Sequence, residues 1–167
     1  GGTIKTETSE PATNGLSLYQ SASILCIIAA SLFILSTLFR FWRADIAYAL
    51  GYNLDLAGEY QEGYPNLHKA VALRGDEPIF KDELSINSAI IAAGLLTQQP
   101  AKDSKEQTVA VASALAQEAI NASNEVVSEY KNNTVFWKTR TRVFYTLSQA
   151  DSRYLPRALD SIEKASL

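Results

Sequence analysis

Residues 21–39 read SASILCIIAASLFILSTLF, and this stretch decides the fold of the chain. It holds no charge, no proline and no glycine, and its apolar character already begins at Leu16. About 20 uncharged apolar residues are enough for one helix to cross the hydrocarbon core of a bilayer. We therefore predict that residues 16–43 form a transmembrane helix with its flank, and that residues 1–15 form a polar loop.

The apolar run ends at a group of side chains that suit a membrane surface. Arg40, Trp42 and Arg43 directly follow Phe39. An indole ring favours the headgroup layer, and arginine side chains reach from there into water. We assign Arg40, Trp42 and Arg43 to the membrane–water interface, which makes the lipid bilayer the first expected partner.

Three other interpretations of the run are weaker. A buried helix of a soluble protein usually has polar breaks sooner. A cleaved signal peptide needs a basic start and a small-residue site directly after its apolar core, but Lys5 is offset by acids and Ala47-Tyr48-Ala49 lies beyond two arginines. A lipoprotein cysteine follows small residues, whereas Cys26 follows Ser-Ile-Leu in the middle of the run.

Composition limits the classes of function. A net charge of −3 over 167 residues gives no global basic field, so we expect no nucleic-acid partner. One cysteine and one histidine, His68, provide neither an internal disulfide nor a cysteine-built zinc site, and we expect no metal and no cofactor. Because methionine is absent and the last residues stop within a helical pattern, we expect a segment of a longer protein.

A helical repeat follows the membrane segment. The tetratricopeptide repeat (TPR) is a helix–turn–helix of about 34 residues in which small residues let two helices approach closely. Leu50-Gly51 fills the first helix position, Gly58 and Tyr60 fill the turn, and Gly63 with Ala70 fills the second helix. The first unit therefore covers residues 44–77.

The first unit departs from the repeat pattern at three positions. Ala47 stands where the repeat often has Trp, and Gly75 stands where it often has Pro. Pro65 lies early in the second helix, where proline removes a hydrogen bond and bends the backbone. We expect that helix to begin late or to be kinked.

Two further units follow. Pro78 is a favoured first helical residue, and the apolar spacing predicts helices over 78–97 and 105–131, the second with a Ser104–Gln107 capping box. The third unit starts after Asn132-Asn133, and Pro156 opens its last helix. We predict an all-α fold: one transmembrane helix, then a short α-solenoid of about three TPR-like helix pairs over 44–167, in about seven helices. The approximate units are 44–77, 78–131 and 133–167.

Two stretches resemble a known family. RFWRADIAYALGYNLDLAGEYQEGYPNLHKAVALRGDEPIFKDELS and NNTVFWKTRTRVFYTLSQADSRYLPRALDSIEKA are similar to the carboxy-terminal region of bacterial O-antigen ligase/polymerase-like membrane proteins. In that family a last membrane helix runs into tetratricopeptide repeats. The resemblance covers residues 16–167, and the join between span and repeat is its most specific feature.

The resemblance implies a membrane-anchored scaffold in the bacterial inner membrane. The family transfers or polymerises lipid-linked glycans, but its functional residues lie on upstream membrane helices and an external loop, so a glycan substrate would be contacted only by that upstream region. We carry no catalytic residue onto this chain and expect no activity from it alone. The alternative is a single-span TPR adaptor for envelope or secretion complexes, unrelated to glycans.

We expect the scaffold to bind a protein partner through its first repeat. In TPR arrays the concave face of the first helix usually meets the ligand, and the matching positions are Asp45, Tyr48, Tyr52 and Asp55. The chain lacks the Lys/Asn pair that grips a peptide carboxylate in some TPR proteins. Two arginines after the span against Lys5 before it favour a cytoplasmic repeat domain.

Other polar residues have simpler explanations. We expect His68 to be a partly exposed helix residue. The acid pairs Asp76-Glu77 and Asp82-Glu83 lie near a predicted helix start, where negative charge is favourable. A basic cluster in the third unit suits either a solvated face or anionic lipid: Lys138, Arg140, Arg142, Arg153 and Arg157.

Overall fold

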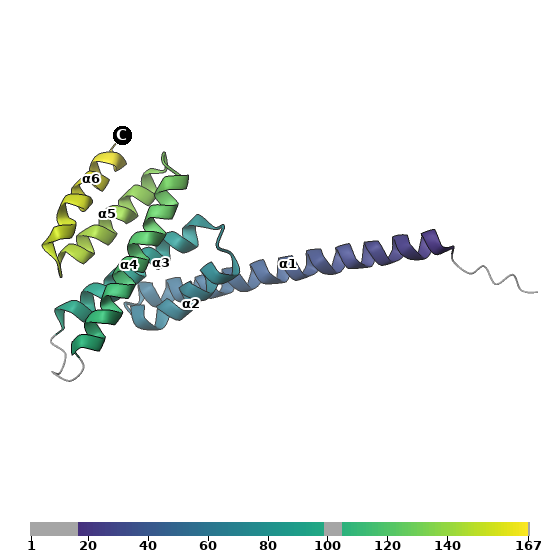
Figure 1. Cartoon of the computed structure of the whole chain (residues 1–167), viewed down its shortest axis with the longest axis horizontal. Helices are drawn as coiled ribbons and strands as arrows, with labels where there is room; N and C mark the ends of the chain where they lie inside the picture. Colours follow the sequence, from purple (N-terminus) through teal and green to yellow (C-terminus); the bar gives the residue numbers. More distant parts are fainter. Residues whose placement is uncertain (1–16, 99–104, 167) are drawn as a thin grey trace, which may run out of the picture. The chain divides into compact units, whose positions relative to one another are not determined.

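The computed structural model describes residues 17–98 and 105–166 and is helical throughout that part of the chain (Figure 1). It has no strand among the described residues, which confirms the all-α prediction. The elements are α1 (Leu18–Leu56), α2 (Tyr60–Leu73), α3 (Pro78–Thr97), α4 (Lys105–Glu129), α5 (Thr134–Ser148), the short 3₁₀ helix η2 (Ser152–Tyr154) and α6 (Leu155–Ala165). The predicted polar loop 1–15 and the capping residue Ser104 lie outside the described residues.

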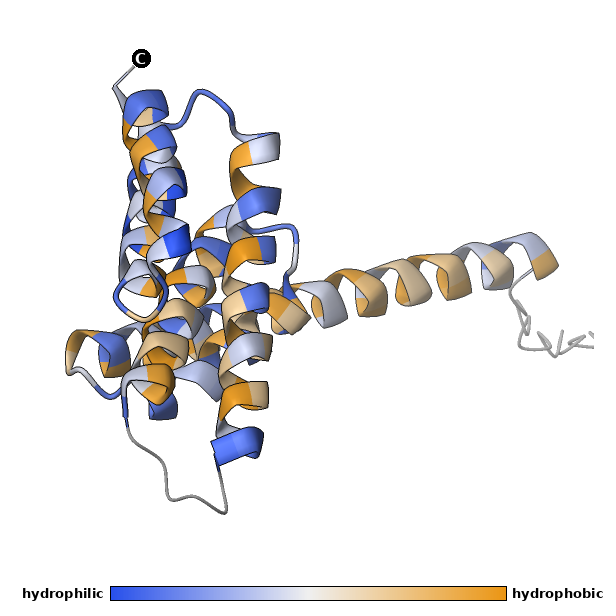
Figure 2. Ribbon diagram, turned by 60° about the vertical axis from the view of Figure 1, so that its left-hand side comes forward, coloured by the Kyte–Doolittle hydropathy of each residue, from blue (hydrophilic) through white to orange (hydrophobic). Residues whose placement is uncertain are grey.

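The chain divides into two compact units at Leu38–Phe39. The first unit contains the beginning of α1. The side chains of the apolar stretch of this helix are exposed. Figure 2 shows apolar colours along this part of the helix. By length and composition α1 can cross a membrane, and it is the one helix among the described residues that can.

Two hydroxyl groups within the apolar run are bonded to their own helix. Ser23 Oγ donates to the Tyr19 carbonyl at 2.8 Å, and Thr37 Oγ1 donates to the Phe33 carbonyl at 3.0 Å. Such bonds satisfy a hydroxyl without water, as a hydrocarbon environment requires. The run is therefore compatible with lipid at Ser23 and Thr37 as well.

The second unit begins at Phe39 and contains the rest of α1 together with α2–α6. Here α1 packs closely on α2, because Gly51 and Gly63 carry no side chain at the contact. A Cβ on Gly51 would lie 2.7 Å from Leu67 Cγ, and a Cβ on Gly63 would lie 3.0 Å from the Gly51 carbonyl oxygen. The small residues predicted at these positions thus allow the two backbones to approach.

Gly58 makes the turn between these helices. Its φ of +83° is in the left-handed region that favours glycine. The amide of Gly58 donates to the Asp55 carbonyl at 3.0 Å and the amide of Glu59 donates to the Leu54 carbonyl at 2.9 Å, which is the pattern of a Schellman cap. The turn predicted from Gly58 and Tyr60 is present.

Of the two expectations for Pro65, the late start of α2 is wrong, while a kink stays a prediction. Helix α2 begins at Tyr60, and Pro65 lies inside it. Proline removes the bond to the carbonyl four residues earlier, on Gln61, but Gln61 is exposed and water can satisfy that oxygen. Among the described residues, a short additional helical piece is η2, which occupies the turn predicted before Pro156.

Helix α3 is the most enclosed helix of the second unit. Its observed bounds, Pro78–Thr97, equal the predicted ones, and Pro78 lies at the start as expected. It packs against α2, α4 and α5. Helix α3 also contacts α1, where Phe80 stacks on Tyr48 with ring centroids 4.7 Å apart.

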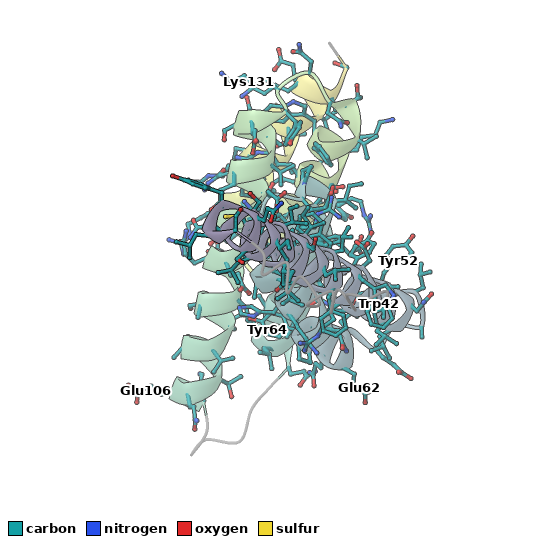
Figure 3. The ribbon with its side chains drawn as sticks, turned by 90° about the vertical axis from the view of Figure 1, so that its right-hand side faces the viewer. Trp42, Tyr52, Glu62, Tyr64, Glu106 and Lys131 are labelled. Atoms are coloured by element: carbon teal, nitrogen blue, oxygen red, sulfur yellow. The ribbon has the colours of Figure 1, made fainter. Side chains whose placement is uncertain are left out.

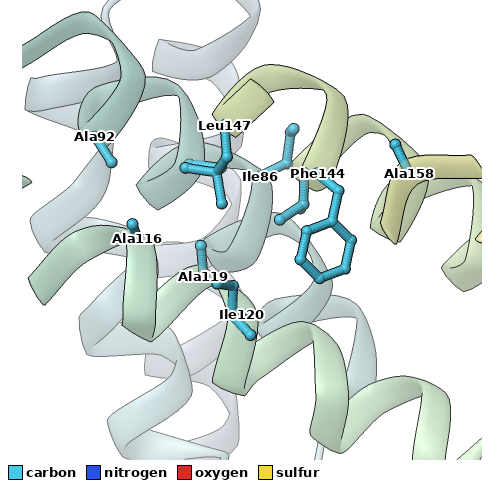
Figure 4. Close-up of a cluster of buried hydrophobic side chains, with 10 residues drawn as sticks. Ile86, Ala92, Ala116, Ala119, Ile120, Phe144, Leu147 and Ala158 are labelled. Carbon is cyan, nitrogen blue, oxygen red and sulfur yellow. The ribbon is translucent and has the colours of Figure 1, made fainter. Parts of the chain in front are cut away.

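The main hydrophobic core joins α3 to α4, α5 and α6 (Figure 4). Alanines at the helix contacts let the larger Ile86, Phe144 and Leu147 interdigitate, and Phe144 is fully buried. Truncating such an aromatic side chain typically destabilises a protein by about 3–5 kcal/mol. The core residues are Ile86, Ala89, Ala92, Ala116, Ala119, Ile120, Val143, Phe144, Leu147 and Ala158.

A smaller cluster closes the turn between α4 and α5. Val126, Val127 and Phe136 are buried there, and the Trp137 Nε1–H donates to the Lys131 carbonyl at 2.7 Å. Asn133 caps α5 by accepting a bond from the Val135 amide at 3.0 Å. Helix α4 ends at Glu129, two positions before the predicted end at residue 131.

Candidate functional site

Three of the four predicted partner-binding residues lie together in the second unit. Tyr48 and Tyr52 stack on one another with ring centroids 5.8 Å apart, and Tyr48 continues the stack onto Phe80 of α3. Tyr52 is 38% exposed and is labelled in Figure 3. The pair therefore presents aromatic surface at the α1–α3 contact rather than only filling the core.

Asp45 does not belong to this group. Its carboxylate is exposed and lies 3.5 Å from Arg74 Nη1, at the turn between α2 and α3. Arg74 also pairs with Glu77 at 2.8 Å and lies over the ring of Phe41. Asp45 thus belongs to an ion-pair group at that turn, where Arg74 also lies 5.9 Å from the centroid of the Phe80 ring. A shared binding face with Asp55 stays a prediction.

Asp55 is held inside the second unit and is 7% exposed. The Asn87 side-chain amide donates to Asp55 Oδ1 at 2.7 Å and to the Tyr60 carbonyl at 2.9 Å. A Cβ on Gly63 would collide with Asp55 Oδ1. Asn87 and Gly63 together fix the position of this carboxyl group.

Helix α3 adds two carboxyl groups that the sequence analysis treated only as helix-start charges. The Glu83 carboxyl lies within hydrogen-bonding reach of Asp55, and the Asp82 carboxyl lies within reach of the Thr139 hydroxyl of α5. Asp82 and Glu83 are both half-buried. We call Asp55, Asp82 and Glu83 the carboxyl cluster.

Burial raises the pKa of every member of the carboxyl cluster. It raises the pKa of Asp55 to about 6 and that of Asp82 to about 7. The pKa of Glu83 is also raised, first by burial and then by the charge of Asp55. Arg142 of α5 acts in the opposite direction on the pKa of Asp82 and Glu83, because its positive charge favours the ionised carboxylates.

Two oxygen atoms at this place have no hydrogen-bond donor in the protein. They are Asp55 Oδ2 and Asn87 Oδ1, and Asn87 is fully buried. Buried acceptors are normally satisfied, so their occurrence here requires an explanation. A carboxyl pair can share one proton, which would bond Asp55 to Glu83 and leave the Asn87 oxygen as the remaining unpaired acceptor.

The predicted interfacial residues are exposed at the beginning of the second unit. Trp42 is 58% exposed and lies 5.7 Å from the ring of Phe39. Arg40 lies over Phe41, and Arg43 lies over Phe39, each within 6 Å of the ring centroid. Aromatic rings and arginines therefore alternate on the surface that follows the apolar run.

The remaining sequence candidates have ordinary surroundings. His68 is exposed, 3.8 Å from Glu118 Oε1, as expected for a surface histidine. Cys26 is exposed on the apolar run. Arg140 donates to Asn124 Oδ1 at 2.8 Å and Arg153 pairs with Asp151, so two cations of the predicted basic cluster have their own local partners.

Side chains from three helices make up the candidate site. Among the described residues, no group of three or more His, Cys, Asp or Glu side chains is placed to hold a metal ion. Helices α1, α3 and α5 instead contribute aromatic rings, carboxyl groups and one arginine to one region. A comparison of the chain with protein-family models, curated proteins and solved structures found no match.

Proposed function

We propose that this chain is the membrane-anchored, TPR-like interaction region of a bacterial O-antigen ligase or polymerase-like protein, and that it binds a protein partner. Tyr48, Tyr52 and the carboxyl cluster lie together in one region, which we name the inner face. We assign the partner to this inner face. The glycan chemistry would reside in membrane segments outside residues 1–167. This chain would organise a partner beside that enzyme.

One observation carries the proposal. Helix α1 combines an apolar stretch whose window is wholly exposed with a second part that packs into a helical unit through Gly51. An exposed apolar surface of that length needs a lipid or protein environment. A helix that is both a candidate span and the first helix of a repeat is the feature that the O-antigen ligase resemblance rests on.

The pairing of helices supports the TPR-like part of the proposal. The second part of α1 pairs with α2, α3 packs on α4, and α5 packs on α6. Helix α3 contacts α1 through the Tyr48–Phe80 stack and also packs on α5. When helix pairs stack into a solenoid, the first helix of each pair is expected to lie next to the first helix of the neighbouring pair.

Photocrosslinking tests the partner role. A benzoylphenylalanine at Tyr52 is expected to capture a distinct membrane or cytoplasmic protein in native cells, whereas the same probe at the exposed Val109 of α4 is expected to capture none. A captured protein of envelope glycan synthesis supports the ligase reading. A captured secretion or envelope-assembly protein would favour the adaptor alternative, and identical products from both positions would overturn the partner role.

Thiol labelling tests the orientation. We propose that the repeats lie on the cytoplasmic side of a bacterial inner membrane. Arg40 and Arg43 follow the span, and positive charge next to a span favours the cytoplasmic side. With Cys26 replaced by Ser, a cysteine at the exposed Ser128 should resist an impermeant thiol reagent in intact cells and react after lysis. Labelling in intact cells would place the repeats outside.

A further inference from the structure

We infer that a pocket between α4, η2 and α6 binds the phosphate group of a small phosphate monoester. None of the residues that line this pocket belongs to the inner face, so the inference goes beyond the proposed partner role and does not depend on it. Three observations carry it: accessible hydrogen-bond donors in the pocket wall, a half-buried arginine without a carboxylate, and a surplus of two positive charges.

The first observation is the pocket itself. Its volume of about 540 Å³ is within the range of small-molecule sites and leaves space for an organic group beside a phosphate. Arg153 and Arg157 bring guanidinium donors to its wall, and both residues are exposed. The polar side chains of the lining are Gln117, Asn124, Asp151, Arg153, Tyr154 and Arg157.

The second observation is Arg140 of α5, which lies behind the pocket wall and is half-buried. Its Nη1 donates to Asn124 Oδ1 at 2.8 Å and to Ser123 Oγ at 3.3 Å, and both acceptors are neutral. No ion pair between described residues includes Arg140. Because charges removed from water are normally paired, an anion is the component that this site lacks.

The third observation is the charge balance. Asp151 is the one carboxylate of the lining, and Arg153 neutralises it, with Nη2 2.6 Å from Asp151 Oδ2. Arg157 has no ion-pair partner within residues 17–98 and 105–166. Arg140 and Arg157 therefore remain as two uncompensated positive charges.

These two arginines lie beside the same buried ring. Their Cζ atoms lie 4.7 Å and 5.7 Å from the centroid of Phe144, which Figure 4 shows in the core. Burial lowers the pKa of Arg140, the charge of Asp160 raises it, and the charge of Arg157 lowers it again. Asp160 is itself paired with Lys164 at 3.1 Å, so an external anion would relieve the repulsion between the two guanidinium groups.

The size of the surplus selects the anion. A phosphate monoester carries a charge of about −1.5 to −2 at neutral pH and has three strong acceptor oxygens, whereas a carboxylate carries a single charge. Guanidinium groups match the geometry of phosphate oxygens and bind them with charge-assisted hydrogen bonds. Two unpaired arginines therefore favour a phosphate monoester over a carboxylate.

The test uses the full chain in micelles of an uncharged detergent and titration calorimetry at constant ionic strength. Glycerol phosphate is expected to bind saturably and at least about tenfold tighter than acetate, and glycerol is expected not to bind. A phosphoserine peptide that binds about tenfold tighter than glycerol phosphate would overturn the small-molecule source.

A matched pair of variants tests the charge. Arg157→Gln should weaken glycerol phosphate by about tenfold or more, because it removes an unpaired guanidinium from the pocket wall. Lys138→Gln removes the same charge from an exposed position two residues before Arg140, on the opposite side of α5, and should leave binding unchanged. Equal weakening by both variants would mean that net charge alone attracts the ligand and would overturn the site.

Asn124→Asp tests the missing anion directly. The new carboxylate would lie at the oxygen that already accepts from Arg140, so it should remove the need for an external anion and abolish glycerol phosphate binding. Thermal unfolding followed by circular dichroism should show that the ligand raises the Tm of the wild type but not of Asn124→Asp, which should be at least as stable as the wild type without ligand. Equal binding of glycerol phosphate and acetate, or unchanged binding by both pocket variants, would overturn the inference.

Discussion

Gly63 occupies the closest point between α1 and α2. Its missing side chain leaves room for Asp55 Oδ1 and for the carbonyl of Gly51. The Asp55 oxygen cannot move aside freely, because Asn87 holds it at 2.7 Å. The absence of a side chain at Gly63 therefore permits both the close helix contact and the observed orientation of the buried Asp55 carboxyl group.

Gly63→Ala should consequently destabilise the protein by about 1–3 kcal/mol, as overpacking of a tight contact does. Gly94→Ala is the matched control, because a Cβ there meets nothing within 4 Å and alanine favours the helix. The control should be neutral or more stable by up to about 1 kcal/mol. Urea unfolding followed by circular dichroism measures both, and equal effects would contradict this account of the contact.

The carboxyl cluster makes stability depend on pH. The folded-state pKa of Asp55 is raised to about 6 and that of Asp82 to about 7, from an ordinary value of 3.8. The folded state therefore holds protons more tightly than the unfolded chain does. By linkage, the contribution of these two groups to the free energy of unfolding should be largest below pH 3.8 and should be lost as pH rises from there to about 7.

Urea unfolding at several pH values between about 4 and about 8 checks this trend. Asp82→Asn removes one of the titrating groups and should flatten the decline, while Glu129→Gln should leave it unchanged. A stability that rises between pH 4 and pH 7 in the wild type, with no change of slope in Asp82→Asn, would show that the cluster carboxyls are not buried in solution.

Asp45 and Asp55 show what the residue pattern alone could predict. Both are acids on α1 and both match helix positions that face ligands in TPR arrays, yet one pairs with Arg74 and the other bonds to Asn87. Asp82 and Glu83 were missed because their neighbours, Asp55 and Thr139, come from helices distant in sequence. No spacing within α3 reveals that pairing.

At the scale of the element, helix α6 carries apolar residues both on its buried face and on its exposed face. Ala158 is 2% exposed and packs into the core, whereas the neighbouring Leu159 is 60% exposed. Small residues at the contact allow α6 to lie close to α5. The larger apolar residue on the outer face contributes little to folding.

Ala158→Leu should therefore destabilise the protein by about 1–3 kcal/mol, although leucine is more hydrophobic than alanine. Leu159→Ala, one position away, should change stability by less than about 0.5 kcal/mol. Thermal unfolding of the two variants side by side makes the comparison. A larger effect at Leu159 would mean that its side chain is buried against something in solution.

Element boundaries followed the sequence where a proline or glycine marks them. Helix α3 begins at Pro78 as predicted, since proline at the first position loses no helical bond. The start of α2 was predicted incorrectly, because Gly58 determines it and Pro65 is tolerated where the residue four positions earlier, Gln61, is exposed. Whether a proline interrupts a helix depends on where the released carbonyl points, and that is a property of tertiary structure.

At the scale of the whole molecule, the two compact units have different requirements. Residues 39–166 bury their own hydrophobic core, while the apolar stretch of α1 is exposed. A helix of that composition was the most secure prediction from sequence, because length and the absence of charge determine membrane compatibility. The stacking of the later helices depended on weaker, degenerate repeat signals.

Membrane flotation tests this division. The full chain should float with vesicles and resist carbonate extraction, whereas a chain starting at Phe39 should stay in the aqueous fraction and remain helical. Replacing Ile28 and Leu32 by arginine should release the full chain, because each arginine near a bilayer centre costs about 2.5–3.5 kcal/mol. A full chain that remains soluble and monomeric without detergent would refute the span.

The contact between Gly63 and Asp55 also has a consequence for how related sequences are expected to vary. A lineage that gains alanine at the position of Gly63 has to shorten or lose the aspartate opposite, and Asn87 then loses the acceptor that its amide serves. The three positions should change together or stay together, so an alignment of relatives should show Gly63, Asp55 and Asn87 as a covarying set. Chains that retain all three would be those in which natural selection still maintains the buried carboxyl.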